Sequence, residues 1–213
     1  MSKTNEPLLP TVLLTATALV CASLGPASPA TLEPTQSPPT NDPRLEMITA
    51  LPALGPHPSV GDHARLFDRF VGTWDFDCVF YATDGSATRF PGEWIFGWVL
   101  DGRALQDVWT DYAKGREPRD RGMGTSMRFY DAKAGLWRVV WVAPVSRNLL
   151  ILKGGAQGGR ILLEGQDSDG SWLRWSFNDI QADSFVWRGE SSRDGGKTWR
   201  LEEEHRMKRR TGA

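Results

Sequence analysis

The stretch Leu66–Ala82, LFDRFVGTWDFDCVFYA, marks the change from a short amphipathic segment to an alternating β-strand. After Gly72-Thr73 a large apolar residue or Cys78 recurs at every second position, which is the period of a strand with one buried face. No helical-period stretch of useful length follows in the rest of the chain. The stretch therefore predicts the first strand of an all-β domain.

Turn signals divide the chain beyond Phe70 into short apolar segments. Pairs such as Asp84-Gly85 and Asp101-Gly102 supply the positive φ angles that hairpins need. A meander of this length most simply removes its edges by closing on itself. We predict a closed antiparallel up-and-down β-barrel of about ten strands, at 70–82, 87–100, 103–112, 122–130, 136–145, 148–153, 160–166, 171–180, 184–191 and 198–209.

The first sixty residues differ in composition from the rest. Thr11–Leu24 is an uncharged run of signal-peptide length, too short to span a bilayer as a helix. We assign 1–24 to a signal peptide or hydrophobic leader, 25–61 to a Pro-rich flexible linker and 62–210 to the barrel. A short helix over His63–Phe70, with Ser59 and Asp62 as capping residues, is expected to plug one barrel end. Export to the periplasm or cell exterior is expected, with a cytoplasmic protein as the alternative.

Charge and cysteine content exclude several functions. The 25 basic and 26 acidic side chains give a net charge of -1, without the basic face of a nucleic-acid-binding protein. Cys21 and Cys78 are the only cysteines, and no His/Cys group has zinc-ligand spacing along the chain. We therefore predict no metal, no nucleic-acid partner and no stable membrane span. The sequence leaves the oligomeric state open.

The two-residue period assigns an inner face to most strands. Met123, Met127 and Phe129 are placed inward on the fourth strand, whereas the apolar fifth strand is ambiguous. A ten-stranded barrel is wide enough to leave room for a ligand, so large inner side chains are candidate contacts. The candidate ligand-binding residues are Trp74, Phe76, Trp94, Trp98, Gln106, Trp109, Met127, Trp175 and Trp187.

His205 is the one histidine within the predicted strands, and Glu203 shares its inner face. A neutral imidazole beside a carboxylate in an apolar lumen is suited to general acid/base catalysis. Asp107 adds a further carboxylate from the third strand. A satisfied buried polar pair is the alternative interpretation of Glu203 and His205.

Several motifs occur in the order of a known family. They are VGTW at 71–74, VLDGRALQDVW at 99–109, FYDAKAGLW at 129–137, SSRDGGKTW at 191–199 and EEEHRMKR at 202–209. This order resembles the uncharacterised bacterial lipocalin-like domain family and, more broadly, the lipocalin and fatty-acid-binding (calycin) barrels. The resemblance implies a small-molecule pocket and no particular reaction. The segment from Ser192 to Trp199 also matches the Asp-box pattern, here as one copy that favours a stabilised hairpin.

Three functions follow from these observations. The first is passive binding of an apolar or aromatic small molecule, with Gln106, Arg138 or Glu203 orienting its polar end and no cofactor. The second is a barrel enzyme of isomerase, cyclase or hydratase type that uses His205 and Glu203. The third follows from a resemblance to the nitrobindin barrels, which implies haem bound through His205.

Overall fold

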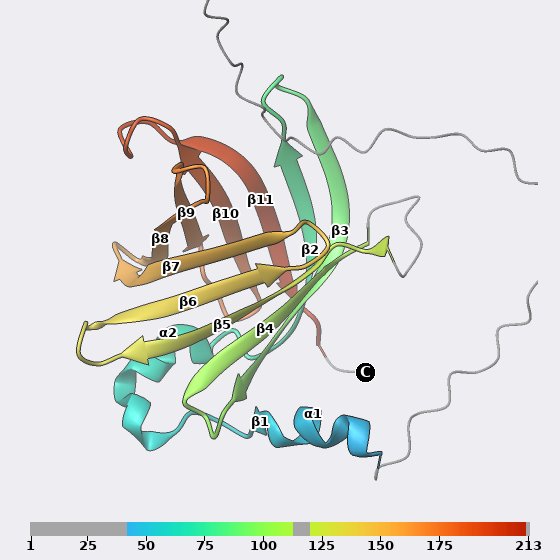
Figure 1. Ribbon diagram of the computed structural model, residues 1–213, viewed down its shortest axis with the longest axis vertical. Helices are drawn as coiled ribbons and strands as arrows, with labels where there is room; N and C mark the ends of the chain where they lie inside the picture. Colours follow the sequence, from blue (N-terminus) through green and yellow to red (C-terminus); the bar gives the residue numbers. More distant parts are fainter. Residues whose placement is uncertain (1–41, 113–119, 212–213) are drawn as a thin grey trace, which may run out of the picture. The chain divides into compact units, whose positions relative to one another are not determined.

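The computed structural model describes residues 42–112 and 120–211, and within these ranges the chain forms a closed barrel (Figure 1). Ten antiparallel strands pair in chain order, and β11 returns to pair with β2. The strands are β2 Gly72–Tyr81, β3 Ala87–Val99, β4 Ala104–Asp111, β5 Met123–Asp131, β6 Leu136–Ala143, β7 Asn148–Gln157, β8 Arg160–Gln166, β9 Trp172–Asn178, β10 Ser184–Ser192 and β11 Arg200–Arg209. This architecture confirms the predicted ten-stranded up-and-down barrel.

Short elements precede the barrel in the chain. They are η1 Pro43–Leu45, α1 Glu46–Ala50, β1 Pro52–Ala53, η2 Pro58–Ala64 and α2 Arg65–Asp68. Strand β1 pairs with the end of β3, where Pro52 lies opposite Val99. Regular structure therefore begins within the stretch assigned to the linker. The leader, Cys21 and linker residues 25–41 lie outside the described residues.

The segment η2–α2 lies across one end of the barrel, called here the closed end (Figure 1). In place of the predicted helix over His63–Phe70, the chain forms the end of the 3-10 segment η2 followed by the single α turn of α2. Gly61, with a φ of 58°, kinks the chain within η2. The capping residue is His57, whose side chain accepts a hydrogen bond from the Ser59 amide, so the predicted caps Ser59 and Asp62 are wrong.

Aromatic side chains fill the closed end. Phe67 and Phe70 are fully buried, and Phe67 contacts Trp137 with a centroid distance of 4.8 Å. Two indoles hold the plug by hydrogen bonds, because Trp74 Nε1 donates to the Phe70 carbonyl and Trp98 Nε1 to Asp68 Oδ1, each at 2.7 Å. The closed end is thus a packed hydrophobic core.

Strand β5 faces the opposite way from the prediction. Met123 and Phe129 are 46% and 47% exposed, whereas Ser126 and Arg128 on the other face are 0% and 1% exposed. The predicted inward facing of Met123, Met127 and Phe129 is therefore wrong. The physical reason is that Ser126 and Arg128 on the inner face both bond to the buried Asp107 side chain of β4. Buried polar residues with such partners are tolerated, so hydrophobic alternation identifies the wrong face of β5.

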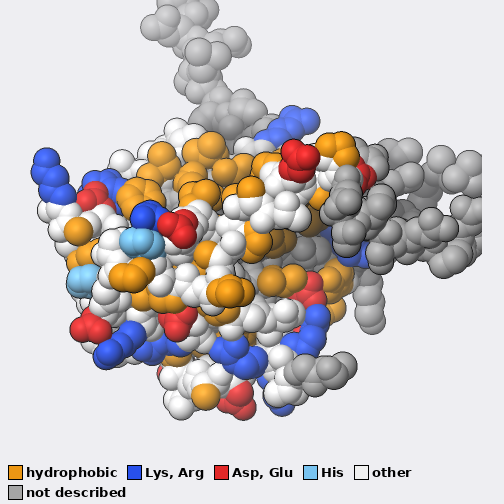
Figure 2. Space-filling view, turned by 90° about the horizontal axis from the view of Figure 1, so that it is seen from below, with side chains coloured by type: hydrophobic (Ala, Val, Ile, Leu, Met, Phe, Trp, Pro, Cys, Tyr) orange, Lys and Arg blue, Asp and Glu red, His pale blue; other side chains and the backbone are white. Residues whose placement is uncertain are grey.

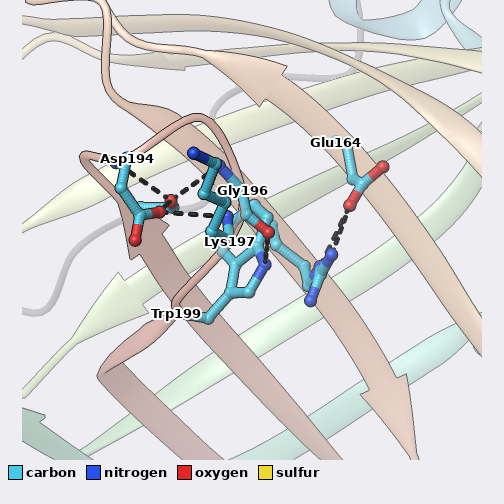
Figure 3. Close-up of polar contacts among 7 residues, drawn as sticks. Glu164, Asp194, Gly196, Lys197 and Trp199 are labelled. Atoms are coloured by element: carbon cyan, nitrogen blue, oxygen red, sulfur yellow. Dashed lines mark hydrogen bonds and ion pairs between the residues drawn. The ribbon is translucent and has the colours of Figure 1, made fainter.

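The hairpin between β10 and β11 is held by its own side chains (Figure 3). Asp194 Oδ1 accepts hydrogen bonds from the amides of Lys197 and Thr198 at 3.0 and 2.9 Å. Trp199 Nε1 donates to the Gly196 carbonyl at 3.0 Å, and the Arg174 guanidinium lies 3.7 Å from the Trp199 ring centroid. The Asp-box segment thus forms a closed local network, consistent with the structural interpretation.

The outer surface mixes charges of both signs. On the face in Figure 2, basic and acidic side chains are interspersed with hydrophobic ones. Within the described part of the chain, no helix has the length and apolar character needed to cross a membrane.

Candidate functional site

A circuit of aromatic rings lines the barrel lumen beyond the closed end. We call it the aromatic belt and define it as Phe76, Trp109, Trp141, Trp175, Trp187 and His205. Successive centroids lie 6.4 Å apart for Trp109 and Trp141, 5.8 Å for Trp141 and Trp175, and 5.4 Å for Trp175 and Trp187. His205 completes the circuit at 4.7 Å from Trp187 and 6.0 Å from Trp109.

The belt combines buried and partly exposed rings. Phe76, Trp187 and His205 are buried, whereas Trp109, Trp141 and Trp175 are of intermediate exposure. The Glu203 side chain is 36% exposed, so solvent reaches this side of the lumen. The belt therefore offers aromatic surface that is accessible from the barrel end opposite the plug.

Three glycines within strands make room for belt rings. A Cβ at Gly92 would lie 2.0 Å from Phe76 Cζ, and one at Gly124 would lie 2.1 Å from Trp141 Cη2. A Cβ at Gly189 would lie 2.8 Å from Trp187 Cη2. Glycine in a strand interior weakens the strand but allows close approach. These positions place the rings against the wall of the barrel.

Three buried ring nitrogens near His205 have no hydrogen-bond partner. They are the Nε1 atoms of Trp109 and Trp187, together with His205 Nδ1. Trp94 lies beneath the belt, with its ring centroid 6.0 Å from that of Trp187 and 6.3 Å from that of His205. An indole N–H is a donor only, and leaving such a group unpaired in the interior costs about 1–3 kcal/mol. The belt therefore presents donors that an acceptor can satisfy.

His205 and Glu203 lie together, as the sequence predicted. His205 Nε2 and Glu203 Oε2 are 3.2 Å apart, and His205 is 2% exposed. Cys78 is the register partner of His205 across β2 and β11. Burial raises the pKa of the Cys78 thiol far above its usual range, and the negative charges of Glu203 and Asp111 add to that shift.

A buried ion pair lies between the belt and the plug. Arg128 Nη2 contacts Asp107 Oδ2, and the Ser126 amide donates to Asp107 Oδ1 at 3.0 Å. Burial raises the pKa of Asp107 and lowers that of Arg128, while the charge of each partner opposes the change in the other. The Arg128 guanidinium also lies 5.0 Å from the Phe67 ring centroid. Asp107 therefore serves as the counterion of Arg128.

The predicted ligand-binding residues occupy three different places. Phe76, Trp94, Trp109, Trp175 and Trp187 belong to the belt or contact it. Trp74 and Trp98 lie in the closed-end core, where their indole N–H groups are already bonded to the plug.

Gln106 and Met127 lie on the outer face of the sheet, opposite Asp107 and Arg128. Gln106 Nε2 donates to Thr125 Oγ1 at 3.0 Å, so the prediction that Gln106 and Met127 face the lumen is wrong. Arg138 is also outside the lumen, because its side chain pairs with Asp131 at 2.6 Å.

Sequence reasoning missed Trp141 and the three glycines of the belt. Trp141 lies on β6, whose two faces are both apolar, so periodicity gave no direction there. The signal that identifies it is Gly124 on the neighbouring strand, since a glycine inside a strand indicates close approach of another group.

A groove of about 370 Å³ lies outside the closed end, between η2–α2 and the strands β5, β6 and β7. His63 stacks on Tyr130 there, with a centroid distance of 3.8 Å. Among the described residues, none of the buried polar atoms without a partner belongs to the groove lining. The belt is therefore the better candidate for ligand binding.

The closed ten-stranded meander with a plugged end and an aromatic lumen defines a lipocalin-like barrel protein. The structure resembles the S-type phycobiliprotein lyase CPES from Guillardia theta with a TM-score of 0.51 and 11% identity, over 70% of this chain and 93% of that one. It also resembles Rv2717c from M. tuberculosis with a TM-score of 0.50 and 13% identity, over 73% of this chain and 99% of that one.

At these identities the likeness shows the fold alone. No protein-family model matches the chain, and no curated protein matches its sequence. Membership of the uncharacterised bacterial lipocalin-like family therefore stays a prediction.

Proposed function

We propose that the aromatic belt binds a small aromatic or otherwise apolar molecule that carries a hydrogen-bond acceptor. The observation that carries this proposal is the group of three unpartnered ring nitrogens around His205, on Trp109, Trp187 and His205 itself. Two of them belong to indoles, which can only donate, so the complementary ligand group is a carbonyl, carboxylate or similar oxygen. The barrel fold shared with a phycobiliprotein lyase is consistent with a lumenal ligand.

The contact area comes from the partly exposed rings of Trp109, Trp141 and Trp175. An aromatic ligand that stacks on these rings, or meets them edge to face, gains about 0.5–1.5 kcal/mol per ring pair beyond the effect of the apolar area buried. The N–H donors then favour apolar molecules that carry an oxygen acceptor, because a ligand without one leaves the donors unpaired and binds less tightly.

The proposal is tested with two probes that differ in one acceptor, naphthalene and 2-acetylnaphthalene. Binding is followed by quenching of tryptophan fluorescence and by native mass spectrometry. A neutral hydrogen bond contributes about 0.5–1.5 kcal/mol, so the ketone should bind roughly 2- to 12-fold more tightly. Equal affinity of the two probes, or absence of binding, would refute the proposal.

A pair of variants locates the donor. Trp187→Phe keeps a ring but removes an unpartnered N–H, so it should reduce the preference for the ketone. Trp172→Phe is the control, because Trp172 is 39% exposed on β9 and lies outside the belt. An equal effect of both variants would show that the belt is not the binding site.

Acid/base catalysis by His205 and Glu203 is the second candidate, supported by their 3.2 Å contact. It predicts that His205→Gln abolishes turnover of a bound ligand while its affinity persists. A haem fits this arrangement poorly, because coordination through His205 Nε2 requires loss of the Glu203 contact and separation of the rings that bury the imidazole. We therefore derive no role for haem.

A further inference from the structure

Three side chains with metal-binding atoms meet on the inner faces of β2 and β11. Cys78 lies opposite His205 in the strand register, and Glu203 precedes His205 by two residues on the same face. The thiol sulfur, an imidazole nitrogen and a carboxylate oxygen all lie within 4.8 Å of one another. The residues come from opposite ends of the barrel sequence, so spacing along the chain gave no indication of this group.

The donor set suits a particular class of ion. Thiolate, neutral imidazole and carboxylate are the ligands of Zn²⁺, with bond lengths of about 2.0–2.3 Å. Two ligands of one tetrahedral ion then lie about 3.5 Å apart. His205 Nε2 and Glu203 Oε2 are already 3.2 Å apart, so small side-chain rotations complete the geometry.

The surroundings of the group favour a cation. Cys78 and His205 are 1% and 2% exposed, and a carboxylate oxygen of Glu203 lies within 4.8 Å of the Cys78 thiol sulfur. A divalent ion offsets that charge in a medium of low dielectric constant. The partly exposed Glu203 side chain provides an approach from solvent.

We propose that Cys78, Glu203 and His205 bind one divalent transition-metal ion of the zinc class. The ion replaces the thiol proton of Cys78, which leaves to solvent, and it takes the lone pair of His205 Nε2. The remaining imidazole proton then resides on Nδ1, the nitrogen without a protein partner. Three protein ligands leave a fourth position for water or an anion. This inference revises the prediction of no metal and is independent of the proposed ligand.

The test uses Co²⁺ as a spectroscopic probe, added to the full chain carrying Cys21→Ser. That parent has one thiol, so a thiolate-to-cobalt charge-transfer band in the near ultraviolet reports on Cys78 alone. The expected result is a band that saturates at one equivalent of Co²⁺ and is displaced by Zn²⁺. Absence of the band would overturn the proposal.

Variants separate this site from adventitious binding. Cys78→Ser should remove the band, and Glu203→Gln and His205→Gln should each weaken Co²⁺ binding by at least about 10-fold. The controls are His57→Gln and His63→Gln, which change the other two histidines and should leave binding unchanged. A band that persists in Cys78→Ser, or that is weakened equally by the controls, would contradict the assignment.

A measurement without substitution at the site covers the case in which a variant fails to fold. X-ray absorption of the Zn²⁺-loaded parent should show one sulfur at about 2.3 Å and nitrogen or oxygen ligands at about 2.0 Å. A first shell of oxygen alone would show that the ion lies elsewhere.

Discussion

Replacement of Gly92 by alanine probes how tightly the aromatic belt is fitted to the barrel wall. A Cβ at this position would lie 2.0 Å from Phe76 Cζ and 2.5 Å from the Thr110 carbonyl oxygen. To restore an ordinary contact of 3.4 Å, the ring would retreat by about 1.4 Å and the backbone of the neighbouring strand by about 0.9 Å. Phe76 has little room to move, because its ring stacks on Trp109 and His205 at centroid distances of 5.5 and 4.8 Å.

The expected cost lies at the upper end of the range for overpacked interiors, about 3 kcal/mol. For a domain of this size that corresponds to a fall in Tm of roughly 6–12 °C. Urea denaturation followed by tryptophan fluorescence gives the free energy of unfolding, and calorimetry gives the Tm.

Gly97→Ala in the same strand is the matched control. A Cβ at Gly97 meets nothing within 4 Å, so the substitution should be neutral or stabilising by about 0.5 kcal/mol. If Gly92→Ala unfolded at the same urea concentration as Gly97→Ala, the fit of Phe76 against β3 would be disproved.

Three further predictions address other parts of the structure. Arg128→Met leaves Asp107 buried without its counterion and should lower the free energy of unfolding, measured by urea denaturation, by about 3–5 kcal/mol. Adding Asp107→Leu should restore most of that stability, and a double variant no more stable than Arg128→Met would contradict the pairing. The hydrogen bonds within the hairpin hold the pKa of Asp194 at about 2, below its ordinary 3.8. Their contribution to stability is therefore complete above pH 3.8 and is lost as the pH falls to about 2. The Tm difference between the parent and Asp194→Ala should therefore narrow from about pH 5 to about pH 2, and a constant difference would argue against this contribution. Gly124→Ala should displace the partly exposed Trp141 ring, weakening 2-acetylnaphthalene binding with a smaller loss of stability than Gly92→Ala, while Gly155→Ala should change neither.

The architecture was readable from local signals. Hairpin dipeptides and two-residue alternation predicted the ten strands. The charged alternate positions of β11 correctly predicted that Glu203, His205 and Met207 face inward. These features are local because each strand carries its own pattern and each turn its own backbone requirement.

The candidate site was only partly readable. On β5 the hydrophobic pattern pointed the wrong way, because Arg128 on the inner face is neutralised by Asp107 from the neighbouring strand. Hydrophobic periodicity depends only on the polarity of each residue, so it does not detect an ion-pair partner on a neighbouring strand.

The sequence by itself determined a closed barrel with an aromatic interior, since hydrophobic alternation and turn chemistry act over a few residues. Only the tertiary structure decided which rings form the belt and which fill the closed end. It alone brought Cys78 to His205 and left the indole nitrogens of Trp109 and Trp187 without partners, because those relations depend on strands that are far apart in the sequence and meet only in the closed barrel.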